Sequence, residues 1–300
     1  MIELLLRRRN LLLRKQEELN IRAVCFEADG EQTVSITKVG SAPDITMQYS
    51  YDGVNWDAWD LTPLPFGGST KVYVRGVSNE RFGADNKNYN KITFSTDAFV
   101  YVSGIVESLL DGENEVIAFD SPGILRNLFY QQTALRSAEN LHFEVIRTGY
   151  NGVAVYAYMF YGCTNLLYAP NALTITIFSG GYECSYMFGG CTSLVTAPEL
   201  PATSLYGNVY SYMFQGCTSL VNAPELPATT LAVRCYQYMF YGCTSLKTIR
   251  CRAKTTAANA TVYWLYDTSS SGTFYGHSEY GWSTGASGIP SGWTFEEMTD

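Results

Sequence analysis

The chain has 300 residues and a formal net charge of -8, with 28 aspartates and glutamates against 20 lysines and arginines. This acidic balance argues against a nucleic-acid-binding protein, because such proteins carry a concentrated basic surface. The length is enough for two ordinary domains, and no apolar run reaches the roughly 18 residues that predict a membrane-spanning helix.

The first twenty residues, MIELLLRRRNLLLRKQEELN, predict a helix, because they are rich in leucine, arginine and glutamate and contain no glycine or proline. An arginine cluster splits the apolar run and no small-residue cleavage site follows, which argues against a secretory signal peptide. We interpret residues 1–20 as an assembly arm that docks onto another protein or a second copy of the chain. Its candidate contact residues are Leu5, Arg7, Arg8, Arg9, Leu12 and Leu19.

From residue 21 to residue 103 apolar and polar residues alternate, as in QTVSITK, KVYVRG and KITFST. Turn-forming clusters such as ADG and GADN separate these runs. Short alternating runs divided by turn residues predict a small antiparallel β-sandwich.

Within this region, the stretch SYDGVNWDAWD (50–60) combines two tryptophans with three aspartates. Trp56 and Trp59 are candidate ligand-binding residues, because with the neighbouring carboxylates they could form a sugar platform or a calcium site. The alternative is a β-hairpin in which Asp52 and Gly53 make the turn and the tryptophans fill the sandwich. The residue pattern favours the hairpin.

Residues 104–253 carry a repeat: AYMFYGCTNL, SYMFGGCTSL, SYMFQGCTSL and QYMFYGCTSL follow one another. Their methionines lie 28, 26 and 26 residues apart, and a fixed period of this size predicts a solenoid of stacked units. Tyr210, Met213 and Phe214 have the spacing of one helical turn, so each unit is expected to join a helical turn to a short strand. Residues 254–300, which lack the repeat, are expected to form a C-terminal cap.

The repeat places two sets of tyrosines in register. Tyr156, Tyr210 and Tyr236 are expected in the core, because they share a face with the buried methionine. The second set points elsewhere and is expected to be exposed, and exposed tyrosines provide rigid contact area for binding. Its members are the candidate binding residues Tyr158, Tyr186, Tyr212 and Tyr238.

Four of the eight cysteines occupy one slot of the repeat, and we expect them to stack as reduced thiols. Disulfides between neighbouring coils remain an alternative. A zinc site is not expected, because no C-x-x-C motif occurs and only His142 and His277 are available. The same scarcity of histidine leaves no material for a catalytic triad, and no nucleotide-binding motif is present. We therefore predict no catalytic residue and no cofactor, although a carboxylate pair for glycoside cleavage stays open.

The motif MFxGCTSLxxAPELPATxL, the lead-in YVSGIVESLL (101–110), the segment NLFYQQTALRSAENL (127–141) and the tail GTFYG…WSTGASGIPSGWT resemble the BspA-like leucine-rich-repeat proteins of gut Bacteroidales and of their mobile elements and phages. The resemblance covers roughly residues 100–297. It implies non-enzymatic binding or adhesion, often on a cell or virion surface. The chain departs from the pattern where APNALTITIFSGG replaces APELPATTL, so one coil is expected to be irregular.

Together these observations predict a mixed fold: an N-terminal helix (1–20), a small antiparallel β-sandwich (21–103), a leucine-rich-repeat solenoid (104–253) and a C-terminal cap (254–300). The expected function is that of a virion component, a fibre or a capsid or tail decoration, that binds a host surface protein or glycan. The arm would join other virion or surface proteins and support a homo-oligomer. The alternatives are a bacterial cell-surface adhesin and, less favoured, a glycan hydrolase.

Overall fold

The computed structural model describes residues 21–112, 123–143, 154–174 and 181–299. These residues are almost entirely strands, bridges and turns, and their helical content is limited to two short 3-10 helices, η1 (Val106–Leu109) and η2 (Ser278–Tyr280). The predicted helix over residues 1–20 lies outside the described residues. In the part of the chain that is described, no helix has the length and apolarity needed to cross a membrane.

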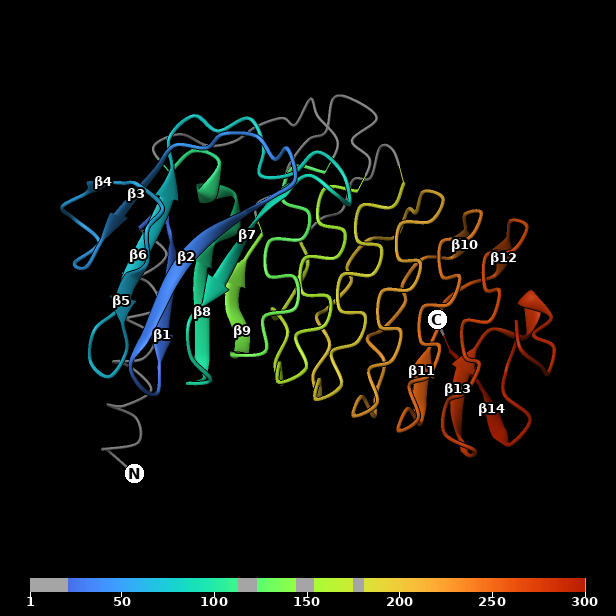
Figure 1. The fold of residues 1–300 in the computed structure, drawn as a ribbon. Coiled ribbons are helices and arrows are strands. Elements are labelled where there is room, and N and C mark those ends of the chain that lie inside the picture. Colours follow the sequence, from blue (N-terminus) through green and yellow to red (C-terminus); the bar gives the residue numbers. More distant parts are fainter. Residues whose placement is uncertain (1–20, 113–122, 144–153, 175–180, 300) are drawn as a thin grey trace.

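The first part of the described chain forms two facing sheets (Figure 1). The smaller sheet has the strand order β5 (Leu64–Phe66), β2 (Gln32–Val39) and β7 (Tyr89–Phe94). The larger sheet has the order β4 (Asp57–Trp59), β3 (Met47–Ser50), β6 (Val72–Gly76), β1 (Val24–Ala28), β8 (Val100–Ile105) and β9 (Leu135–His142). Phe26 of β1 contacts Phe66 and Phe94, with ring centroids 6.2 and 5.7 Å apart, so the two sheets share a core.

The larger sheet leads directly into the repeats. Its strands pair antiparallel except at β8 and β9, which run parallel. The predicted boundary between residues 103 and 104 therefore falls inside β8, and one hydrophobic core continues from Val24 to Ile289. Beyond β9 the chain forms coils that lie side by side as far as the C-terminal strands (Figure 1). Short parallel pairs join them, formed by β10 (Thr230–Leu231), β11 (Thr248–Arg250), β12 (Thr255–Thr256), β13 (Gly272–Gly276) and β14 (Trp293–Glu297).

Each repeat is built from successive turns in which every fourth residue is left-handed. In one coil Asn208, Tyr212 and Gly216 have φ values of 61°, 60° and 72°. The N–H of Met213 donates to the carbonyl of Tyr210 in its own coil (3.2 Å), whereas the N–H of Phe214 donates to Met239 in the next coil (2.9 Å). Backbone donors thus alternate between their own turn and the neighbouring coil.

This geometry corrects the predicted fold class. A helical turn would direct consecutive N–H groups to carbonyls four residues earlier, and a left-handed residue at every fourth position prevents that. The mixed fold with helical turns in a leucine-rich-repeat solenoid is therefore wrong. The described residues form a nearly all-β chain with several small sheets joined by turn-built coils.

A phenylalanine ladder runs through the centre of the coils. Its rings are fully buried and nearly parallel, with adjacent centroids 5.2 to 5.6 Å apart, and its members are Phe129, Phe160, Phe188, Phe214 and Phe240. Identical rings stack in this way because each coil repeats the register of the coil before it. Trp264, also fully buried, stacks on Tyr236 at 6.2 Å and on Trp282 at 5.5 Å in the last part of the chain.

The cysteines follow the same register, and all eight are free and buried. Each thiol of the repeated slot donates to a phenylalanine carbonyl, as Cys217 does to Phe188 at 3.1 Å and Cys243 to Phe214 at 3.0 Å. Burial raises the pKa of Cys243 to about 12, so the thiol stays protonated at neutral pH.

Candidate binding surface

A row of tyrosines occupies the middle left-handed position of successive coils. We call this set the tyrosine row, and its members are Tyr158, Tyr186, Tyr212, Tyr238 and Tyr263. Adjacent rings stack with centroids 4.6, 4.3, 4.7 and 5.3 Å apart. The structure thus places the four predicted binding tyrosines together and adds Tyr263. The predicted core tyrosines Tyr156, Tyr210 and Tyr236 are buried, which confirms that assignment.

The stacking explains how tyrosine is tolerated at a left-handed position. That conformation costs a non-glycine residue about 1–2 kcal/mol, because Cβ crowds the backbone. A stacked aromatic pair contributes about 0.5–1.5 kcal/mol, and an inner ring such as Tyr186 or Tyr212 has two stacked neighbours. The cost of the left-handed backbone and the contribution of the stacked rings are of similar size, so the row holds its rings in strained but fixed positions.

A second set of tyrosines flanks the row and is interrupted in the middle. Tyr130 stacks on Tyr161, and Tyr241 stacks on Tyr266, each at 5.5 Å. The two intervening coils have Gly189 and Gln215 at this position. A Cβ atom on Gly189 would lie 2.9 Å from the ring of Tyr161, so the glycine is needed where that ring leans over the next coil.

The chemistry of the row is that of neutral hydroxyl groups. Parallel rings cover one another's faces, so a half-buried row presents ring edges and phenol oxygens. Burial raises the pKa of Tyr158, Tyr186 and Tyr212, and neighbouring phenols raise it further in Tyr186. The hydroxyls of these three tyrosines therefore stay protonated at neutral pH and can both donate and accept hydrogen bonds.

The stretch SYDGVNWDAWD forms the hairpin of β3 and β4, with Met47 opposite Trp59. Trp59 is buried and its Nε1 donates to the carbonyl of Thr62 at 2.8 Å. Trp56 lies under the guanidinium of Arg75, 4.1 Å from the ring centroid. Trp59 is therefore in the core and Trp56 lies beneath an arginine, so the two tryptophans do not form a joint platform.

The carboxylate of Asp52 is occupied by its own turn. The N–H groups of Val54 and Asn55 donate to Oδ1 at 2.8 Å each, and the hydroxyl of Ser50 donates at 2.9 Å. These hydrogen bonds, those from Asn55 first, hold the pKa of Asp52 well below its usual value. Among the described residues no group of three His, Cys, Asp or Glu side chains has metal-binding geometry.

The candidate residues of the assembly arm lie outside the described residues. They are Leu5, Arg7, Arg8, Arg9, Leu12 and Leu19.

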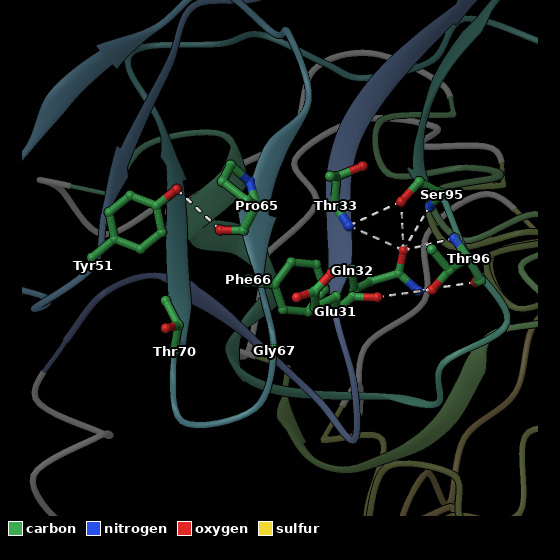
Figure 2. Close-up of a pocket in the computed structure, with 10 residues that line it drawn as sticks. All are labelled: Glu31, Gln32, Thr33, Tyr51, Pro65, Phe66, Gly67, Thr70, Ser95 and Thr96. Carbon is green, nitrogen blue, oxygen red and sulfur yellow. Dashed lines mark hydrogen bonds between the residues drawn. The ribbon is translucent and has the colours of Figure 1, made fainter.

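A hollow of about 720 Å³ lies against β2 and β5 of the smaller sheet (Figure 2). Several of its polar groups already form hydrogen bonds within the protein. Gln32 Oε1 accepts from the N–H groups of Ser95 (2.7 Å) and Thr96 (2.9 Å), and its Nε2 donates to the Thr96 carbonyl (2.9 Å). On the other side the Tyr51 hydroxyl donates to Pro65 at 3.0 Å. A ligand in this hollow would find few free groups at the walls.

A second hollow, of about 560 Å³, separates the APELPA segments of two coils and is lined mainly by prolines. Of its two carboxylates, Glu225 is paired with Arg252. The lining therefore mixes proline and leucine side chains with the carboxylates of Glu199 and Glu225.

A third, smaller hollow adjoins the tyrosine row where the row begins. It measures about 190 Å³ and is lined by Asn86, Tyr89, Asn127, Tyr130 and Tyr158. No sequence pattern indicated it, because Asn127 belongs to the most degenerate copy of the repeat and Asn86 to a loop of the first sheets. The sequence did contain one signal for this position. Asn127 directly precedes Leu128 and Phe129, which align with the Met-Phe pair of later copies.

Comparisons of the chain with protein-family models, with curated proteins and with solved structures found no match. The resemblance to BspA-like proteins therefore stays a prediction from the sequence motifs.

Proposed function

We propose that this chain is a non-enzymatic binding protein whose tyrosine row recognises a glycan on a host surface. The observation that carries the proposal is the row itself: five tyrosines held in parallel at 4.3–5.3 Å spacing. This spacing is close to the length that one pyranose adds to an extended polysaccharide. Phenol hydroxyls that both donate and accept hydrogen bonds match the hydroxyls of a sugar chain.

Fixed rings favour such a binding mode. Tyrosine loses little conformational entropy on binding, and rings stacked on both sides lose less still. Residues that must hold strained backbone positions also cluster at ligand-binding surfaces. Both arguments apply to a row of half-buried tyrosines at left-handed positions.

Removing two hydroxyls from the middle of the row tests the proposal. The double variant Tyr186→Phe/Tyr212→Phe keeps both stacked rings and is expected to bind a glycan selected on an array of bacterial surface polysaccharides about 30-fold more weakly. Each lost hydrogen bond is worth about 1 kcal/mol, and every 1.4 kcal/mol is tenfold in Kd. Binding would be measured by surface plasmon resonance.

Tyr168→Phe provides the matched control, because Tyr168 is an exposed tyrosine in the parallel bridges and not in the row. Its affinity should equal that of the unchanged protein. An array without any bound glycan, or equal loss in both variants, would contradict the proposal.

The proposed setting is a virion, with a bacterial cell surface as the alternative, and it rests on the motif resemblance. Residues 1–20 are the proposed attachment segment. Sedimentation of the full chain and of a chain starting at Ile21 tests this: the full chain is expected to be a trimer or larger and the shortened chain a monomer. Two monomers would rule out self-assembly through the arm and leave attachment to a different protein.

A further inference from the structure

We propose that the hollow at the start of the tyrosine row binds one acidic sugar residue, with its carboxylate against Arg126. The inference deepens the proposed function and rests on it, since it names the class of glycan that the row would receive. Four observations carry it: an amide with no hydrogen bond to a described residue, a guanidinium next to the hollow, three tyrosines in its lining and its size.

The buried amide belongs to Asn127. The residue is only 3% exposed, and its side chain lines the hollow. Within the part of the chain that the structure describes, this amide has no hydrogen-bond partner. Other buried amides are satisfied: Asn90 Nδ2 donates to the carbonyls of Pro43 (2.8 Å) and Phe82 (3.1 Å). The amide is therefore available to hydrogen-bond a ligand hydroxyl in the hollow.

The position of Asn127 is fixed by the coil. Its φ is 58°, and its N–H donates to the carbonyl of Ala157 at 3.1 Å. Asparagine accepts the left-handed conformation better than most residues. The amide therefore enters the hollow from a rigid backbone position, as a preorganised binding group would.

The guanidinium belongs to Arg126, the preceding residue. Its Cζ lies 5.1 Å from the ring centroid of Tyr158, and its Nε is buried without a hydrogen bond to any described residue. Asp85 attracts it from a distance, but that carboxylate accepts from the N–H groups of Lys87 (2.7 Å) and Asn88 (3.0 Å). The arginine thus retains donor capacity for a carboxylate next to Tyr158, one of the residues that line the hollow.

Three tyrosines line the hollow: Tyr89, Tyr130 and Tyr158. Tyr186 stacks on Tyr158 and the Arg126 guanidinium lies over the same ring, so Tyr158 offers its edge and its hydroxyl rather than a face. Lys91 lies 6.0 Å from the ring centroid of Tyr130. Phenol hydroxyls match the hydroxyls of a sugar, and a second cation nearby favours an anionic ligand over a neutral one.

The volume of the hollow suits a single sugar residue. A water molecule occupies about 30 Å³ in the liquid, so a hollow of about 190 Å³ has room for about six waters. That is the scale of one pyranose and too small for a disaccharide. The rest of a polysaccharide would then continue along the tyrosine row.

Titration calorimetry with two small probes tests the inference. Methyl β-D-glucuronide and methyl β-D-glucoside differ only in a carboxylate against a hydroxymethyl group. The unchanged full chain is expected to bind the glucuronide at least tenfold more tightly than the glucoside, because hydrogen bonds to charged groups are the stronger class. Arg126→Gln should abolish this preference while leaving weak binding of both probes.

Two further variants keep the test informative. Asn127→Gly preserves the left-handed backbone and removes the amide, so it should weaken both probes by about fivefold or more. Asn208→Gly makes the same substitution at a left-handed asparagine of a later coil, where φ is 61° and which lies one turn before the tyrosine row, and it should change neither. Thermal melting of each variant confirms folding.

The outcomes separate the inference from the proposed function. Equal binding of the two probes, or a preference that survives Arg126→Gln, overturns the acidic-sugar site. If the array glycan still depends on Tyr186 and Tyr212 in that case, the proposed function stands without it. If neither the probes nor any glycan binds, both fail.

Discussion

Replacement of Phe188 by alanine is expected to lower the free energy of unfolding by about 3–5 kcal/mol. The ring is fully buried and stacks between Phe160 at 5.2 Å and Phe214 at 5.6 Å. The cavity cannot collapse easily, because the backbone above and below is fixed by hydrogen bonds between coils such as that from the Phe188 N–H to Met213 (2.9 Å). Both the transfer of the ring and the residual cavity therefore contribute to the loss.

Urea unfolding followed by circular dichroism measures this effect. Phe295→Ala is the matched control, because the Phe295 ring on β14 is exposed and is expected to cost about 1 kcal/mol. An equal loss in the two variants would mean that the ladder does not hold the coils together. A broadened transition for Phe188→Ala alone would fit coils that unfold as separate nearest-neighbour units.

Raising the pH from 8 to 10 is expected to remove a large part of the stability. Burial raises the pKa of several thiols to about 12, from an ordinary value of 9.0, in Cys163, Cys235, Cys243 and Cys251. Below pH 9 each thiol is protonated in both the folded and the unfolded chain, so its full contribution is present. Between pH 9 and 12 only the unfolded chain ionises, so stability falls as pH rises.

The expected size follows from the linkage. At pH 10 each of these four thiols costs on the order of 1 kcal/mol, so together they cost several kcal/mol. Buried Tyr210 and Tyr236 act in the same direction above pH 10, because burial also raises the pKa of their hydroxyls. A typical domain has only about 5–15 kcal/mol to lose.

Urea titrations at pH 8, 9 and 10 in the presence of a reductant give the free energy of unfolding at each pH. Cys243→Ala isolates one thiol, and the stability of this variant should fall by about 1 kcal/mol less than that of the unchanged chain between pH 8 and 10. A flat profile to pH 10 would show that the thiols are accessible to solvent in the folded chain.

The sequence was sufficient to predict which side chains are buried in the coils. The Phe and Cys slots recur at a fixed interval, so their burial follows from the need of each coil to pack on the next. It was not sufficient to predict the backbone. Tyr210, Met213 and Phe214 have the same spacing in a helical turn and in successive turns with a left-handed residue between them. The feature of the sequence that distinguishes the turns from a helix is the interval of four residues from Tyr212 to Gly216, because glycine commonly adopts the left-handed conformation.

The candidate site, too, could be predicted only in part from the sequence. The tyrosine row was predictable because its members share one slot of the repeat. The hollow beside it was not, because Asn86 and Asn127 come from different parts of the fold and meet only through tertiary packing. The hairpin of Trp56 and Trp59 could be predicted from Asp52-Gly53, yet the position of Arg75 over Trp56 depends on the pairing of β3 with β6.

Because the backbone hydrogen bonds alternate between one coil and the next, a single coil could be duplicated as a unit. The 26-residue interval from Met187 to Met213 recurs from Met213 to Met239, and each coil offers its successor the same donors that it receives. A duplicated coil would therefore insert without disturbing the facing sheets or the C-terminal strands. Each duplication would lengthen the tyrosine row by one tyrosine.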